Sequence, residues 1–211
     1  GSFDITFLST LPNFIIMAPS NQNELIRMIN TSLLIDDRPS AFRYPRGTGE
    51  YDYNDNNFEP IEIGKGIILN KGNDVAILNL GSRLQSCWEA IKILNTNGIN
   101  PTLADARFAK PVDKNLLDEL LDNHKYLLTI EEGSSGGFSA SVLNYIHNQR
   151  IKKTSTKINN IFFPDKFIKH QPAEDQYTEI GMDSDSITSK IRQIYENNVV
   201  DFQSYNKNRR N

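Results

Sequence analysis

Two arginines, Arg43 and Arg46, lie on either side of a Tyr-Pro dipeptide at the end of a short predicted strand. Pro45 ends that strand because it has no N–H for a ladder hydrogen bond. An arginine at the C-terminal end of a strand in an α/β sheet lies where ligands usually bind, and its planar guanidinium fits a phosphate or a carboxylate. The spacing therefore leaves two interpretations: an anion-binding site, or a structural ion pair with Asp36 or Asp37.

A second candidate is the run EEGSSGG at residues 131–137, which follows a predicted strand and opens a predicted helix. Backbone N–H groups at such a helix start can hold an anion. The two adjacent glutamates would repel an anion, however, and no lysine follows the glycines as it does in a P-loop. The run therefore favours a tight turn that lets two elements approach closely.

The remaining ionisable residues show no catalytic spacing, because no Ser/His/Asp or Cys/His arrangement stands out. Three histidines lie too far apart in the sequence to indicate a metal site: His124, His147 and His170. Asp105 and Arg107 flank the end of a predicted strand, where we expect a local or interdomain salt bridge rather than catalysis. Cys87 has the spacing of a helix position that faces a core, so we expect a small buried residue there.

Composition excludes several classes of function. The 211 residues carry a net charge of −3, with 38% hydrophobic and 23% charged residues, which is enough apolar content for a core. No basic stripe follows a predicted helix, which argues against nucleic-acid binding, and no apolar run is long enough to span a membrane. The single cysteine excludes an internal disulfide and indicates a reducing compartment.

Few N-terminal elements are available to position the two arginines. The apolar run at 14–17 predicts a buried parallel strand. Ser20 is the predicted N-cap of the helix that follows, and residues 39–47 predict a strand that runs into a loop. Two strands and one helix cannot bury a sheet alone. We therefore expect residues 1–47 to be the end of a larger domain whose other parts are absent from this sequence.

A complete α/β domain is predicted after a polar linker at 48–60. Between 61 and 197, apolar strand patterns alternate with amphipathic helix patterns. This order predicts a three-layer α/β architecture, with helices on both faces of a mostly parallel sheet. Local signals mark the helix ends: Ser82, Asp113 and Asp183 as N-caps, and Gly98 as a C-terminal stop. Residues 198–211 predict a mobile polar tail.

Several sequence runs share a pattern with one enzyme family. They are FD at 3–4, IMAPS at 16–20, PSAFRYPRG at 39–47, IGKG at 63–66, DARFAKPVD at 105–113, EEG at 131–133 with GGF at 136–138, and PDKFIKH at 164–170. These runs resemble the 1-deoxy-D-xylulose-5-phosphate synthases of the transketolase-like superfamily, over about residues 3–196. The resemblance implies that 1–47 is the end of a pyrimidine-binding domain and that 61–197 is a transketolase C-terminal domain.

The resemblance also implies a parent reaction. Pyruvate is decarboxylated on thiamine diphosphate, and its two-carbon unit is joined to glyceraldehyde 3-phosphate. The products are CO2 and 1-deoxy-D-xylulose 5-phosphate, which enters non-mevalonate isoprenoid synthesis and also feeds thiamine and pyridoxal synthesis. The family implies a homodimer, and Mg²⁺ bound with the cofactor.

Site residues follow from the same resemblance. Arg46 matches the family's phosphate-contacting arginine, and Arg43 matches a residue that supports the strand. Tyr44 is a further candidate for a supporting role. The family's catalytic, cofactor-binding and metal-binding residues lie upstream of this sequence. The chain alone is therefore expected to bind neither cofactor nor metal and to be inactive.

Two other functions remain open from the sequence. In the related β subunits of 2-oxo acid dehydrogenases, the equivalent domain helps to dock an acyltransferase core. Those subunits normally lack the RFAKP run found at 107–111, which favours the synthase. A regulatory domain that binds an effector at 133–137 is the third hypothesis. The resemblance places the protein in a plastid-type organelle or in bacterial cytoplasm, and the Asn-rich composition favours the organelle.

Overall fold

The computed structural model describes residues 2–45, 57–150 and 154–207, and of residues 197–207 it describes the backbone alone. The N-terminal elements are short: α1 (Asp4–Ser9), β1 (Ile15–Met17), α2 (Gln22–Leu33) and β2 (Ser40–Phe42). The C-terminal part is longer and alternates strands with helices: β3 (Ile67–Asn70), β4 (Ala76–Leu80), α3 (Leu84–Thr96), β5 (Thr102–Asp105), β6 (Phe108–Lys110), α4 (Lys114–Asn123), β7 (Tyr126–Ser134), α5 (Phe138–Tyr145) with a π-helical extension (Ile146–Arg150), β8 (Lys157–Phe163), α6 (Ala173–Glu179) and α7 (Ser184–Lys207).

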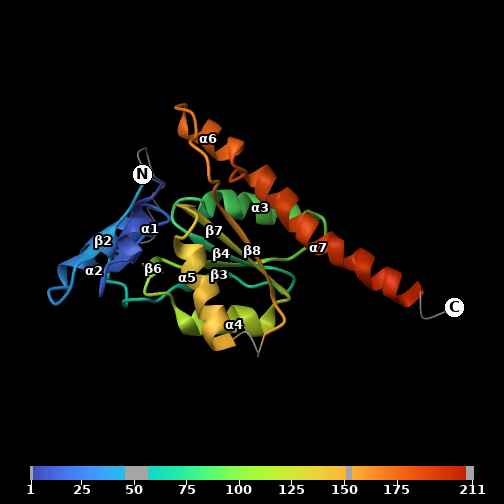
Figure 1. Cartoon of the computed structure of the whole chain (residues 1–211), viewed down its shortest axis with the longest axis horizontal. Coiled ribbons are helices and arrows are strands. Elements are labelled where there is room, and N and C mark those ends of the chain that lie inside the picture. Colours follow the sequence, from blue (N-terminus) through green and yellow to red (C-terminus); the bar gives the residue numbers. More distant parts are fainter. Residues whose placement is uncertain (1, 46–56, 151–153, 208–211) are drawn as a thin grey trace.

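Five strands of the C-terminal part form one sheet in the order β3-β5-β4-β7-β8 (Figure 1). Strands β4, β5, β7 and β8 are parallel, and β3 runs antiparallel to β5 at one edge. Every residue of β4 is buried, as expected of a central parallel strand that is covered on both faces. The predicted mostly parallel sheet is confirmed.

Alternate side chains of β4 enter two separate cores. Ile77 packs with α3 and α7, in a cluster that includes Leu94 and Ile191. Leu78 and Leu80 face the other way and pack with α1, α4 and α5. Because successive strand residues point to opposite faces, one sheet carries helices on both sides. Figure 1 shows α3 and α7 on one side and α4 and α5 on the other, which is the predicted three-layer arrangement.

Several helix ends follow local signals. Asp113 caps α4, and its Oδ1 accepts hydrogen bonds from the N–H groups of Asn115 and Leu116 at 3.1 Å. Asp183 accepts in the same way from the first turn of α7. Gly98 ends α3 at a φ of +76°, a left-handed conformation that glycine adopts without steric cost. These three predictions are confirmed.

Two predicted N-caps are wrong. The N-cap of α2 is Asn21, whose side chain accepts from the N–H of Glu24 at 2.9 Å, because the chain enters the helix one residue later than Ser20. Arg83 occupies the N-cap position of α3 without a side-chain cap bond. Ser82 cannot cap that helix because its hydroxyl donates to Glu132 instead.

Helix α7 continues past residue 197, where the sequence placed the end of the domain, and runs through Lys207. The segment expected to be a mobile polar tail therefore has a helical backbone for most of its length. The physical reason is that 198–207 contains no glycine or proline to stop a helix that Asp183 has started. Among the described helices, none is both long and apolar enough to cross a membrane.

The N-terminal sheet is completed by a strand from the C-terminal part. Strand β1 pairs in parallel with β2 and antiparallel with β6, giving the order β2-β1-β6. The chain leaves β5 for β6 through Arg107, which has a φ of +59° and whose carbonyl accepts from the N–H of Ala18 at 2.9 Å. The Phe108 side chain is completely buried in a core with Met17 and Met28. The two parts of the chain therefore share a sheet and a core, which the sequence did not predict.

Candidate functional site

The three residues singled out near the end of β2 differ in their surroundings. The N–H of Arg43 donates to the carbonyl of Met17 at 2.9 Å, which keeps its backbone in the sheet. Tyr44 is exposed, and its ring stacks on Phe42 with 6.2 Å between ring centroids. Arg46 lies outside the described residues, so its contact with a phosphate stays a prediction.

The guanidinium of Arg43 forms ion pairs on two sides. Its Nε lies 2.9 Å from Oδ2 of Asp4 in α1, and its Nη1 lies 3.0 Å from Oε2 of Glu132 in β7. The two aspartates that the sequence offered as partners are not involved, and Asp37 pairs with Arg38 instead. Arg43 is therefore a structural ion-pair residue that connects the N-terminal elements to the C-terminal sheet.

Glu132 is the centre of a charged cluster, the Glu132 cluster. Its members are Asp4, Arg43, Ser82, Arg83, Glu132 and Tyr177. Oε1 of Glu132 accepts from Nε of Arg83 at 3.1 Å and from the Ser82 hydroxyl, and the residue is only 2% exposed. A carboxylate so deeply buried persists only with charged partners and hydrogen bonds. This one has two arginines.

Tyr177 of α6 completes the cluster. Its ring centroid lies 3.5 Å from Cζ of Arg83, so the guanidinium stacks on the ring face. Burial, and then the charge of Glu132, raise the pKa of Tyr177 to about 12. The phenol is therefore neutral at physiological pH and does not compete with Glu132 for the arginines.

The neighbouring carboxylate, Glu131, caps helix α5. Its Oε2 accepts from the N–H of Phe138 at 2.8 Å, and its Oε1 accepts from the N–H of Ser139 at 2.7 Å. A carboxylate is the kind of anion that a helix N-terminus favours. Burial raises the pKa of Glu131, while the two backbone hydrogen bonds oppose that rise.

The glycines of the 131–137 run make room for that carboxylate. A Cβ atom at Gly133 would lie 2.5 Å from Oε2 of Glu131, and one at Gly137 would lie 2.6 Å from the same atom. The run is therefore a tight turn around a side chain of the protein itself, as the sequence favoured. Glu131 already occupies the anion position at the start of α5, so that position is not open to an anionic effector.

A second buried ion pair joins the two parts of the chain. Nη2 of Arg107 lies 2.7 Å from Oε1 of Glu24 in α2. Asp105 accepts from the backbone N–H of Arg107 at 2.9 Å. Burial raises the pKa of Asp105 to about 6, and the charge of Glu24 adds to that rise. The salt bridge predicted at this strand end is confirmed, and Glu24 is the acidic partner.

The other polar candidates have structural surroundings. His124 is buried, with Nδ1 2.9 Å from the carbonyl oxygen of Leu120 and Nε2 2.7 Å from Oγ1 of Thr102. Cys87 is completely buried in the core under α3, as predicted, and burial raises the pKa of its thiol to about 12. Such a thiol is not a nucleophile at neutral pH. Across residues 2–45, 57–150 and 154–196, no three His, Cys, Asp or Glu side chains form a metal-binding group.

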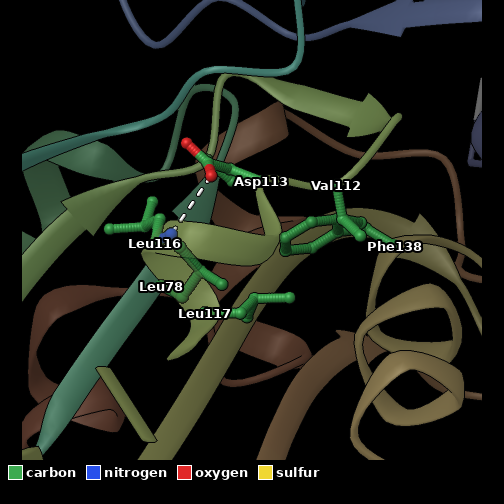
Figure 2. Close-up of a pocket in the computed structure, with 7 residues that line it drawn as sticks. Leu78, Val112, Asp113, Leu116, Leu117 and Phe138 are labelled. Carbon is green, nitrogen blue, oxygen red and sulfur yellow. Dashed lines mark hydrogen bonds between the residues drawn. The ribbon is translucent and has the colours of Figure 1, made fainter. Parts of the chain in front are cut away.

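Figure 2 shows a small pocket lined by side chains of β4, α4 and α5 together with Val112 and Asp113. Its volume of about 10 Å³ holds at most one water molecule. The carboxylate of Asp113 is directed at the start of α4, where it accepts from the N–H of Leu116 (dashed line). The pocket is space left by packing, and it does not fit a substrate.

The two buried glutamates at the end of β7 already have partners within the protein. Thiamine diphosphate, the cofactor that the family resemblance implies, requires a carboxylate for its aminopyrimidine ring and oxygen ligands for a Mg²⁺ ion on its diphosphate. Glu131 is engaged by α5 and Glu132 by two arginines, so neither carboxylate is available for such a role.

Sequence reasoning missed Glu132 and Glu24 as ion-pair residues. The available signal was the position of Glu132 at the end of an apolar strand, where a buried carboxylate requires charged partners. Those partners could not be named from the sequence, because Arg43 lies 89 positions and Arg83 lies 49 positions from Glu132. Only the folded sheet brings them together.

The chain is similar in sequence to a known domain family and to several known proteins. The profile of the family described as "Transketolase, C-terminal domain" matches residues 64–187. The chain is 43% identical over 193 residues to 1-deoxy-D-xylulose-5-phosphate synthase 1, chloroplastic, of Cannabis sativa, a match that covers 90% of this chain and 27% of that protein. It is 41% identical to the probable synthase 2, chloroplastic, of Oryza sativa subsp. japonica, over 90% of this chain and 27% of that protein. It is also 41% identical to the probable chloroplastic synthase of Capsicum annuum, over 92% of this chain and 27% of that protein.

The chain spans 27% of the length of these relatives. Among solved structures, it is similar to a split gene transketolase described as an inactive beta4 tetramer, with a TM-score of 0.80. The match covers 90% of this chain and 60% of that one at 22% sequence identity, so it bears on the fold alone.

Proposed function

The chain belongs to the family of transketolase C-terminal domains, and we propose that it is the C-terminal part of a 1-deoxy-D-xylulose-5-phosphate synthase. The observation that carries the proposal is 43% identity to a plant synthase across 90% of the chain. The longer protein would join the two-carbon unit of pyruvate to glyceraldehyde 3-phosphate and release CO2.

The remaining parts of the proposal concern the longer protein. Thiamine diphosphate and Mg²⁺ would be held by regions outside this sequence, as the family resemblance implies. Glu131 and Glu132 are engaged by α5 and by two arginines. We propose a plastid-type organelle, since the three relatives are named as chloroplastic proteins. We also propose a homodimer, which the family resemblance implies. Within this protein, the C-terminal sheet would serve as the support for the end of β2.

The experiment that tests this function compares the longer protein with the present chain. Each is incubated with pyruvate, glyceraldehyde 3-phosphate, thiamine diphosphate and Mg²⁺, and 1-deoxy-D-xylulose 5-phosphate is measured. We expect product from the longer protein and none from the chain alone, because the cofactor-binding groups would be missing. Product from the chain alone would contradict the proposal that the cofactor-binding groups lie outside this sequence. A folded longer protein that makes no product would refute the function.

A second prediction concerns Arg46, the proposed phosphate-binding side chain. In the longer protein, Arg46→Ala should raise KM for glyceraldehyde 3-phosphate and leave pyruvate use nearly unchanged. Loss of one charge-assisted contact costs about 1.5–3 kcal/mol, which corresponds to a fall of roughly 10- to 100-fold in kcat/KM. The matched control is Arg38→Ala, because Arg38 is an exposed arginine paired with Asp37. An unchanged KM for the phosphorylated substrate would rule out the role of Arg46.

A further inference from the structure

The backbone at the end of β2 is held by a side chain that belongs to the C-terminal sheet. Arg43 follows the last residue of β2, and its N–H is still bonded to the carbonyl of Met17 at 2.9 Å. Its guanidinium is fixed at two points, by Asp4 at 2.9 Å and by Glu132 at 3.0 Å. Because the guanidinium of Arg43 is bound by both carboxylates, these two carboxylates fix the direction in which the chain leaves β2.

Glu132 is the rigid one of the two anchors. The Glu132 side chain is 3% exposed, whereas that of Asp4 is 31% exposed. Arg83 and Ser82 hold the other carboxylate oxygen of Glu132, so that its position does not depend on Arg43 alone. The anchor therefore transmits the geometry of the C-terminal sheet to β2.

A buried ion pair adds little net stability to a fold compared with apolar packing. Well-packed apolar side chains of the same volume often stabilise a fold equally well or better. An arginine–carboxylate pair differs from apolar packing in fixing an orientation, because its hydrogen bonds are directional. The Glu132 cluster therefore suits a role in positioning more than a role in holding the two parts together.

We propose that Glu132 is a positioning residue for the substrate-phosphate end of β2, acting through the guanidinium of Arg43. This inference rests on the proposed function, because it assigns Glu132 to the same phosphate-binding end of the strand. It makes the transketolase C-terminal domain part of the machinery for selecting the phosphorylated substrate. Glu132 itself is not required to touch substrate or cofactor.

The test uses the longer synthase with Glu132→Gln, which keeps the shape of the side chain and removes its charge. We expect KM for glyceraldehyde 3-phosphate to rise roughly ten-fold, because small displacements of binding groups are costly. KM for pyruvate and kcat should change by less than about two-fold. The matched control is Glu24→Gln, which weakens the other buried ion pair between the two parts without touching Arg43. This control should lower the thermal unfolding midpoint and leave both KM values unchanged.

A double-mutant comparison checks that the effect passes through Arg43. Arg43→Ala and the Arg43→Ala/Glu132→Gln double variant should have the same KM for glyceraldehyde 3-phosphate, since the second change removes no further contact to residue 43. Arg43→Lys serves if Glu132→Gln fails to fold, because lysine keeps the charge but cannot bridge both carboxylates. Amide hydrogen exchange at residues 41–43 should also be faster in Glu132→Gln and unchanged in Glu24→Gln.

The outcomes separate this inference from the proposed function. In an active synthase, Glu132→Gln and Glu24→Gln could raise KM for glyceraldehyde 3-phosphate equally, or neither could raise it. Either result overturns the positioning role of Glu132 and leaves the synthase function intact. A general fall in kcat with both KM values raised also overturns it. If the longer protein has no synthase activity, the proposed function fails. In that case, an unchanged rate of amide hydrogen exchange at residues 41–43 in Glu132→Gln would also show that Glu132 does not fix the position of Arg43.

Discussion

Replacing Glu131 by alanine is expected to lower the free energy of unfolding of the C-terminal sheet region by about 3–5 kcal/mol. The carboxylate accepts from the N–H groups of Phe138 and Ser139 at the start of α5. Both donors lose a charge-assisted partner in the variant and lie in a buried place that bulk water does not reach. The measurement is chemical denaturation followed by far-ultraviolet circular dichroism.

Two comparisons make the Glu131 result specific. Glu131→Gln should lose less than the alanine variant, because its amide oxygen can still accept one of the two hydrogen bonds. Glu119→Ala, at an exposed position of α4, should change the free energy by no more than about 0.5 kcal/mol. If Glu131→Ala unfolds at the same denaturant concentration as the unmodified chain, the carboxylate does not hold α5 in place.

Stability should also depend on pH through Asp105. Its pKa is raised from 3.8 to about 6 by burial and by the charge of Glu24. Between about pH 4 and pH 6, the folded state therefore binds more protons at this site than the unfolded state does. The free energy of unfolding then falls as pH rises through this window. The loss is at most about 3 kcal/mol, since each tenfold change in proton affinity corresponds to about 1.4 kcal/mol.

Asp105→Asn removes the ionisation of residue 105 and so isolates its contribution to the pH dependence of stability. The asparagine oxygen can still accept from the N–H of Arg107, as the aspartate does at 2.9 Å, and it cannot ionise. Free energies of unfolding measured from pH 4 to pH 7 should therefore converge at the acidic end and separate as the pH rises, with the variant more stable at pH 7. Parallel profiles for the two proteins would contradict the raised pKa of Asp105.

Local chemistry explains why much of the fold could be predicted. Apolar runs such as 75–78 and capping residues such as Asp113 and Asp183 act over a few positions, so their effects can be recognised in the sequence. Where two neighbours were both suitable caps, the choice failed: Ser20 and Asn21 are equally good cap types, and the turn geometry selected Asn21. Propensity does not resolve a difference of one residue.

The parts that could not be predicted depend on contacts between distant positions. Nothing in the three residues of β6 indicates that they leave the C-terminal sheet and pair with β1. The same is true of the candidate site, because Glu132 meets Arg43 only after both sheets have formed. Its place at a strand end indicated Arg46 as an anion-binding candidate, and the family resemblance assigned it the substrate phosphate, which stays a prediction.

The pairing of β6 with β1 has a consequence for the order of events during synthesis of the protein. β6 follows β1 by roughly 90 residues in the chain, and the ribosome adds about 5–20 residues each second. The edge of β1 that pairs with β6 therefore stays unpaired for several seconds. Unpaired strand edges can form hydrogen bonds with other chains and so promote aggregation. Folding of the N-terminal sheet must wait for the turn at Arg107 to emerge. A chaperone that shields β1 during this interval would be expected to raise the yield of folded protein.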